Sequence, residues 1–407
     1  MSARRTALLW VLVTLIAGLA AYRMQPLLAD SRDAPATGIG TDYRATVYGP
    51  NILVSEHSNP WDPDASVPRF GSFPAPPIWP VSYIAYPLLD RVDYTTGLTL
   101  FMCCSILLVA IGCARIARSL GLSRQRALLV ASLIALSPTH LYDLALGQTG
   151  AGLVAAVAFF AIRARQQPSW WHHVEKWTYG ATILFLFAKP TFALTFLAAN
   201  LAYERSARIF VRFLAAAVAV GLANFIAIVV RSGAGLGTIL RSMRETSTIL
   251  SEVPVNRMDG DRLDLLSLIH PSALLDLIAL VAVAGGLVLL HRMWQTSRSD
   301  LRERLVMGIG LVTIGTYHHT YDSLPLLALL CITVLVWPMR RAIPLTIGLV
   351  VPGWLYGFNA VRTAITDVVA IDFFALSARI IFHVVVAVLV VTYLDTRRQN
   401  ADSITVT

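Results

Sequence analysis

The sequence predicts an all-α polytopic membrane protein, and two observations support this fold class. The 407 residues are 56% hydrophobic and only 14% charged, against about 25% charged residues in an average soluble domain. The apolar residues fall into runs of a length typical of membrane helices, and arginine clusters separate these runs. The composition excludes a soluble multidomain enzyme, a secreted disulfide scaffold and a disordered chain.

Arginine accounts for nearly all of the 33 basic residues, since Lys176 and Lys189 are the only lysines. Most of the arginines lie at the ends of apolar runs. Cytoplasmic loops of membrane proteins carry an excess of basic residues, so we interpret the net charge of +9 as a topology signal and expect no nucleic-acid partner. The four cysteines all lie in apolar runs, which favours buried thiols over disulfides or a zinc site.

We expect a single integral membrane domain, residues 1–407, with about twelve transmembrane helices and a cytoplasmic N-terminus. Arg4 and Arg5 precede the first apolar run. No clear cleavage site follows this run, which favours a signal anchor over a signal peptide. The expected spans are, approximately, 6–23, 96–117, 127–143, 150–163, 177–188, 190–203, 209–230, 272–291, 305–317, 323–337, 342–358 and 375–394.

One choice decides the direction of every later span. Residues 177–203 could form one long span with Lys189 at its centre, or two short helices broken at Ala188-Lys189-Pro190. A lysine in the middle of a bilayer is costly, and a single span would remove the excess of basic residues on the cytoplasmic side. We therefore expect a hairpin of two short helices, which is tolerated where the backbone is buried in protein or lines a cavity.

This topology places two long segments outside the membrane. Residues 24–94 form the first outer loop, residues 231–271 form the second, and residues 396–407 form a short cytoplasmic tail. The second loop begins with a glycine-rich stretch that is not a Walker loop, because no Gly-Lys-Ser/Thr follows. Within it, residues 238–252 are predicted to form an amphipathic helix on the membrane surface.

Polar residues at the ends of the spans gather on the outer face, which makes this face the candidate site. Asp42 begins a helix-like stretch over residues 42–56. An aspartate there is typical of a helix cap or first turn, and the alternative is a general base. Gln148 follows Gly147 in a short turn, where it could end a helix or bond a sugar hydroxyl.

Two further groups lie on this face. Lys189 could snorkel to the interface, or its ammonium could hold a phosphate. His318 and His319, between Tyr317 and Asp322, could be interface residues or could bind phosphate and transfer protons. Adjacent histidines seldom bind one metal ion, and Asp62-Pro63-Asp64 is typical of a turn. We therefore expect no metal cofactor.

These residues, in this order, resemble the polyprenyl-phosphate-sugar-dependent membrane glycosyltransferases of the GT-C superfamily. The resemblance is strongest to glycosyltransferase family 87, a mannosyltransferase-like group, and it extends over nearly the whole chain. The elements similar to the family pattern are Asp42-Tyr43-Arg44-Ala45, Phe73-Pro-Ala-Pro-Pro77, Gly147-Gln148-Thr149, Lys189-Pro190, and His318-His319-Thr320-Tyr321 with Pro325.

The resemblance implies a GT-C-like bundle with an active-site cavity on the outer face of the bacterial cytoplasmic membrane. It implies inverting transfer of a sugar, mannose or arabinofuranose, from a polyprenyl-phosphate donor to a lipid or glycan acceptor, with Asp42 as general base and no cofactor. The implied partners are membrane lipids, the lipid-linked sugar and the acceptor. The donor phosphate would be held by Lys189, His318, His319 and Arg44, and the sugar or acceptor by Tyr43, Gln148, Tyr321 and Asp322.

Three other functions stay open at this point. A flippase or transporter predicts charged span centres and an inverted repeat, and the sequence shows almost no such charge and no repeat. A polymerase or ligase of lipid-linked glycans would also use an outer loop rich in arginine, as residues 231–271 are. A structural subunit without activity is disfavoured by the polar groups on the outer face.

Overall fold

The computed structural model describes residues 40–70, 92–164, 170–186, 190–204, 206–252, 273–296, 299–316 and 324–336. All regular secondary structure in these ranges is helical, as predicted. Three described helices are long and apolar enough to cross a membrane: Tyr94–Ser119, Arg208–Ser232 and Leu277–Thr296. The expected spans at 6–23, 342–358 and 375–394 lie outside the described residues, so the number of twelve stays a prediction.

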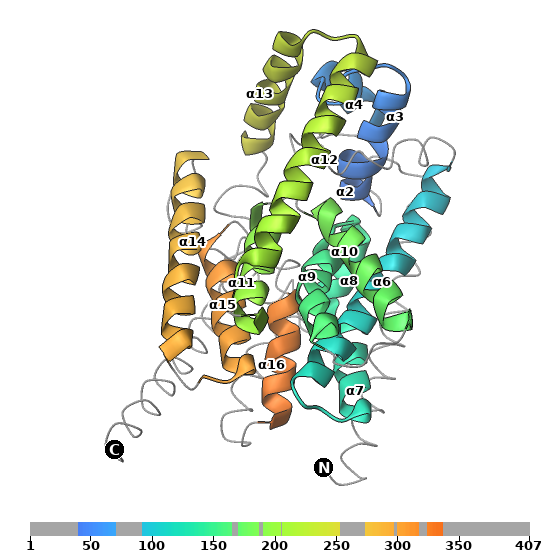
Figure 1. Ribbon diagram of the computed structural model, residues 1–407. Helices are drawn as coiled ribbons and strands as arrows, with labels where there is room; N and C mark the ends of the chain where they lie inside the picture. Colours follow the sequence, from blue (N-terminus) through green and yellow to red (C-terminus); the bar gives the residue numbers. More distant parts are fainter. Residues whose placement is uncertain are drawn as a thin grey trace, which may run out of the picture.

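The helices form a bundle with a smaller layer at one end (Figure 1). The layer contains α2, α3, α4 and α13, and the remaining helices make up the bundle. The elements are α2 (Thr41–Tyr43), the π-helical stretch η1 (Arg44–Tyr48), α3 (Gly49–Ser55), α4 (Pro63–Phe70), α6 (Tyr94–Ser119), α7 (Arg124–Ala135), α8 (Pro138–Leu146), α9 (Gly150–Arg163), α10 (Trp170–Leu186), α11 (Pro190–Glu204), α12 (Arg208–Ser232), α13 (Leu236–Glu252), α14 (Ala273–Thr296), α15 (Leu301–Gly315) and α16 (Leu324–Val336).

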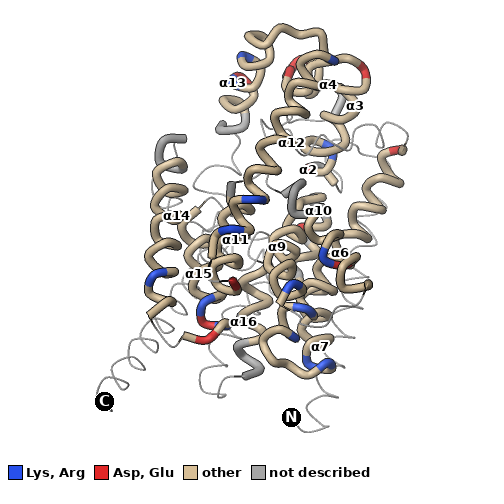
Figure 2. Tube along the Cα trace, viewed as in Figure 1, with Lys and Arg blue, Asp and Glu red and all other residues tan. Residues whose placement is uncertain are grey.

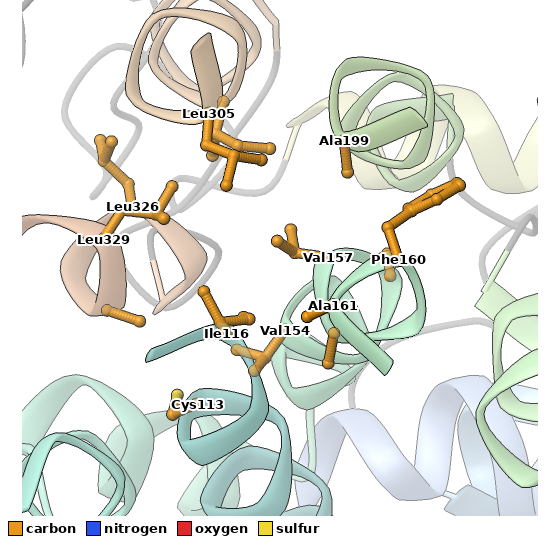
Figure 3. Packing of buried hydrophobic residues seen from close by; sticks show 14 of the residues in the cluster. Cys113, Ile116, Val154, Val157, Phe160, Ala161, Ala199, Leu305, Leu326 and Leu329 are labelled. Atoms are coloured by element: carbon orange, nitrogen blue, oxygen red, sulfur yellow. The ribbon is translucent and has the colours of Figure 1, made fainter. Parts of the chain in front are cut away.

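Helix α9 is the centre of the bundle, because every residue from Gly150 to Ile162 is buried. Figure 3 shows Val154 and Val157 of α9 directed toward side chains of α6, α15 and α16. The close approach of α6 requires Gly112, since a Cβ there would lie 2.8 Å from Cγ1 of Val154. An apolar helix buried on all sides is typical of a core element rather than of a surface helix.

Helices α10 and α11 form the predicted hairpin. Near the end of α6, the Nε of Arg115 donates to Oε1 of Glu175, in the first half of α10, at 2.6 Å. Four residues further along α6, the hydroxyl of Ser119 lies 2.7 Å from that of Tyr203, at the end of α11. The two helices therefore run antiparallel, and the single span through Lys189 is excluded.

The expected span 127–143 is wrong as a single helix. The structure has two helices there, α7 and α8, which are separated at Leu136 and Ser137. Ser137 is extended and its hydroxyl accepts a hydrogen bond from the amide of His140 at 3.2 Å. Proline disfavours the helical conformation in the residue before it, so Pro138 ends α7 and begins α8.

The expectation of buried thiols holds for only part of the cysteines. All four are free, and Cys113 is fully buried in the core, whereas Cys331 is half-buried. Cys103 and Cys104 are exposed on α6. An apolar run is compatible with burial in protein and with exposure to a membrane, so the sequence pattern alone did not distinguish the two positions.

The two predicted outer segments contact each other at one end of the bundle (Figure 1). Arg231, at the end of α12, donates from its guanidinium to the carbonyls of Val54 at 3.0 Å and Ser55 at 3.2 Å. These carbonyls lie in the last turn of α3, where carbonyls lack partners within the helix, and that of Val54 also accepts a hydrogen bond from the amide of His57 at 3.2 Å. The hydroxyl of Thr246 on α13, the predicted amphipathic helix, donates to the carbonyl of Trp61 at 2.9 Å. These bonds fix the layer that carries Asp42.

We predict that cysteines introduced at Ala164 and Ser206 are labelled from one face of the membrane, and a cysteine at Gly235 from the other. The hairpin of α10 and α11 returns the chain to the face where α9 ends, and α12 then crosses. The measurement is labelling of intact cells by an impermeant maleimide, in a variant whose four native cysteines are replaced. Opposite labelling of positions 164 and 206 would contradict the hairpin.

Candidate active site

Asp42 lies in the first turn of α2, at the start of a helical stretch that runs to Ser55 and matches the expected 42–56 closely. Its carboxylate accepts a hydrogen bond at Oδ2 from Nε2 of Gln148, a residue 106 positions away in the chain. A donor to a carboxylate stabilises its ionised form, which is the form that a general base needs. The structure therefore joins two of the residues that the sequence proposed for the site.

A glycine makes this contact sterically feasible. Gly147 ends α8 in the left-handed conformation, with φ of 73°. A Cβ at this position would lie 2.5 Å from Cβ of Tyr43 and 3.0 Å from its backbone nitrogen. The turn between α8 and α9 consequently packs directly on the backbone of α2, and the next residue, Gln148, reaches Asp42.

A buried aspartate to which the sequence assigned no role holds the same turn. Asp143 is fully buried, and its Oδ1 accepts a hydrogen bond from the amide of Gly150 at 3.0 Å. Its backbone carbonyl accepts from the amide of Gln148 at 2.9 Å. The Nδ1 of His140, also fully buried, lies 3.5 Å from Oδ2 of Asp143. Asp143 thus accepts two hydrogen bonds from the turn between α8 and α9, which fixes the conformation of that turn.

Tyr43 is a packing residue in this structure. Its side chain is only 2% exposed, and its ring lies 5.1 Å from that of Phe101 and 6.0 Å from that of Tyr94, centroid to centroid. Burial, together with the neighbouring tyrosines, raises the pKa of Tyr43 to about 12. Tyr43 therefore stays neutral near pH 7 and is unsuited as the base, and its role toward sugar or acceptor stays a prediction.

Arg44 follows Asp42 by two residues in the chain, and its guanidinium lies against Tyr94. It is largely buried, and its Cζ lies 4.6 Å from the centroid of the Tyr94 ring, a distance typical of a cation–π contact. The hydroxyl of Tyr94 donates to the carbonyl of Gly40 at 3.0 Å, which fixes the ring. Within the described residues Arg44 has no ion pair with a carboxylate, and its binding to the donor phosphate stays a prediction.

The remaining predicted site residues are Lys189, His318, His319, Tyr321 and Asp322, and all five lie outside the described residues. Asp62-Pro63-Asp64 is the turn that the sequence indicated, because Oδ1 of Asp62 accepts from the amide of Asp64 at 3.0 Å at the start of α4. In the described part of the chain, no group of three or more histidine, cysteine or acidic side chains is placed to bind a metal ion.

The fold and the site together define a helical protein with long apolar helices and a carboxylate–amide pair near the end of its bundle. The model of glycosyltransferase family 87 matches residues 76–316, which is more than half of the chain. The chain therefore belongs to glycosyltransferase family 87, as its motifs suggested, and it is a glycosyltransferase. The matched region includes Gln148 and begins after Asp42. Among curated proteins and among solved structures, no match was found.

We predict that Gly147→Ala destabilises the protein more than Gly233→Ala does. Both glycines end helices with positive φ, at 73° and 66°, so alanine strains both backbones by about 1–2 kcal/mol. At Gly147 the new Cβ also meets Tyr43, whereas at Gly233 it meets nothing within 4 Å. Overpacking adds about 1–3 kcal/mol. The measurement is thermal unfolding in detergent, and equal losses would show that the contact with Tyr43 is unimportant.

Proposed function

We propose that this glycosyltransferase transfers a sugar from a polyprenyl-phosphate donor to a lipid or glycan acceptor on the outer face of the bacterial cytoplasmic membrane. The observation that carries the proposal is the bond from Gln148 to the carboxylate of Asp42. It places an oriented carboxylate at the end of the bundle where the two predicted outer segments meet. Mannose or arabinofuranose is the proposed sugar, on the basis of the family resemblance.

In the proposed reaction, the acceptor hydroxyl oxygen attacks the anomeric carbon of the donor sugar. A new C–O bond forms as the bond from the anomeric carbon to the phosphate oxygen breaks, and its electron pair leaves with the polyprenyl phosphate. Asp42 accepts the proton of the hydroxyl, which is general base catalysis. One displacement at the anomeric carbon inverts its configuration and forms no covalent intermediate with the enzyme.

The leaving phosphate gains negative charge in the transition state, and nearby cations stabilise that charge. Arg44 is two residues from Asp42 and has no carboxylate partner among the described residues. Lys189, His318 and His319 are proposed to supply the rest. The end of α10 and the start of α11, which flank Lys189 in the sequence, support this proposal, because both lie toward the end of the bundle where α9 begins.

The lipid-linked donor follows from the proposed sidedness. The distribution of arginines favours a position of the Asp42 layer outside the cytoplasm. Nucleotide sugars are cytoplasmic compounds, so a sugar carried on a membrane lipid is the donor available at this face. Asp42 lies on α2, in the small layer at one end of the apolar bundle, and on the proposed topology a lipid phosphate in the outer leaflet can reach this position.

We predict that Asp42→Asn removes sugar transfer and leaves folding unchanged. Asparagine keeps an oxygen that accepts from Gln148 but does not accept the proton, so the rate falls by about 100-fold or more. The measurement supplies purified protein with polyprenyl-phosphate mannose and arabinofuranose, and follows release of polyprenyl phosphate with a labelled product. The matched control is Asp93→Asn, since this exposed aspartate only caps α6.

Normal transfer by Asp42→Asn would reduce Asp42 to a residue of the first helical turn. Transfer of a preformed lipid-linked glycan, without transfer of any lipid-linked monosaccharide, would instead favour the polymerase or ligase. Movement of a lipid-linked glycan across the bilayer without bond formation would favour the flippase.

We predict a partial loss of rate for Gln148→Ala. The amide positions the Asp42 carboxylate, and misplaced catalytic groups cost about 10- to 100-fold in rate. The control is Gln125→Ala, because Gln125 is exposed on α7. A fall in kcat with little change in the KM for the donor would indicate positioning of the base, whereas an unchanged kcat would contradict the role.

A further inference from the structure

A second candidate binding feature lies toward the opposite end of α6 from Asp42. A groove of about 680 Å³ runs between α6 and α7. Its lining is mostly apolar and includes several alanines, among them Ala110 and Ala114 of α6 and Ala131 of α7. Arg115, Arg118 and Arg124 line the same groove. Figure 2 shows basic residues gathered around the ends of α6 and α7, away from α2 and α3.

The arginines carry more positive charge than their neighbours balance. Arg115 is paired with the buried carboxylate of Glu175 at 2.6 Å. Arg118 donates from Nη1 to the carbonyl of Leu122 at 2.8 Å, a neutral partner. Arg124 is exposed and has no ion pair with any described carboxylate. One carboxylate thus faces three guanidinium groups, and the groove favours an anion.

The position of Arg124 is unfavourable for its own helix. It is the first residue of α7, and the first turn contains no acidic residue. Negative charge stabilises the start of a helix and positive charge destabilises it by some tenths of a kcal/mol. The arginine therefore does not serve the stability of α7, and a bound anion would offset its charge.

Exposed tryptophans indicate that the arginines lie at the level of lipid headgroups. Trp170, Trp171 and Trp177 are 74%, 56% and 72% exposed. They belong to the half of α10 that contains Glu175, the partner of Arg115. Tryptophan collects at the membrane–water interface. The groove thus presents cations at headgroup depth and a wall of small apolar side chains next to them.

We propose that this groove binds an anionic phospholipid, with the headgroup phosphate on Arg124 and Arg118 and an acyl chain along Ala114 and Ala131. An amphiphile satisfies both parts of the groove, whereas a soluble anion satisfies only the arginines. Arg118 lies 24 residues after Tyr94, about 36 Å along α6, and Tyr94 packs beside the Asp42 segment. This lipid is therefore distinct from the proposed sugar donor.

The test measures the preference of the protein for phosphatidylglycerol over phosphatidylcholine, with spin-labelled lipids in proteoliposomes. The preference of the wild type is expected to fall about fivefold in Arg124→Gln. The matched control is Arg212→Gln, an exposed arginine of α12 outside the groove, which should keep the preference. Ala114→Leu narrows the groove without changing charge and should also lower the preference.

Three results would overturn the proposal. Equal losses in the Arg124 and Arg212 variants would show general surface charge rather than a site. Displacement of phosphatidylglycerol by inorganic phosphate would show a site for a soluble anion. A stronger preference for polyprenyl phosphate than for phosphatidylglycerol would show a site for the carrier lipid. Because the readout is lipid binding and not sugar transfer, failure of this proposal is separable from failure of the proposed function.

Discussion

The rest of the candidate site depends on the contact between Gly147 and the backbone of Tyr43. This contact joins the turn after α8 to α2, and no other residue type fits between them without displacement. Asp143 holds the turn from within the bundle, and Gly97 leaves room for the Tyr43 hydroxyl from the side of α6. Asp42 and Gln148 are thus brought together by packing of the backbone, and the hydrogen bond between them depends on that packing.

The bundle separates its two kinds of polar chemistry along α6. At the start of this helix, Tyr94 supports Arg44 and Gly40 beside Asp42. At its end, Arg115 pairs with Glu175, and Arg118 lines the groove between α6 and α7. Between these ends α6 packs on α9 through apolar and small residues. The charged groups named here thus lie toward the two ends of α6 and away from its apolar middle, which is the arrangement that a bilayer favours.

The sequence predicted the helical class, the family, the hairpin at Lys189 and the amphipathic helix of the second outer segment. These features follow from local patterns: hydropathy, arginine placement and short motifs. It did not predict that Pro138 divides one expected span into α7 and α8, because the apolar run continues across that break. It also did not predict that Tyr43 is enclosed, or that Asp143 holds the turn. Those properties depend on contacts between distant segments, and no local spacing encodes them.

The length of α9 has a consequence for the depth, within the bilayer, at which the proposed sugar transfer takes place. Its 14 residues rise about 21 Å, which is about 9 Å less than the hydrocarbon thickness of a bilayer. Protein surrounds α9 on all sides, so the helix does not need to match the thickness of the lipid hydrocarbon layer. On the proposed topology, with Arg163 in the cytoplasmic headgroup layer, the turn that carries Gln148 would be recessed below the outer headgroup layer. A donor would then have to lower its phosphate into this recess, where a low local dielectric strengthens every charge that meets it.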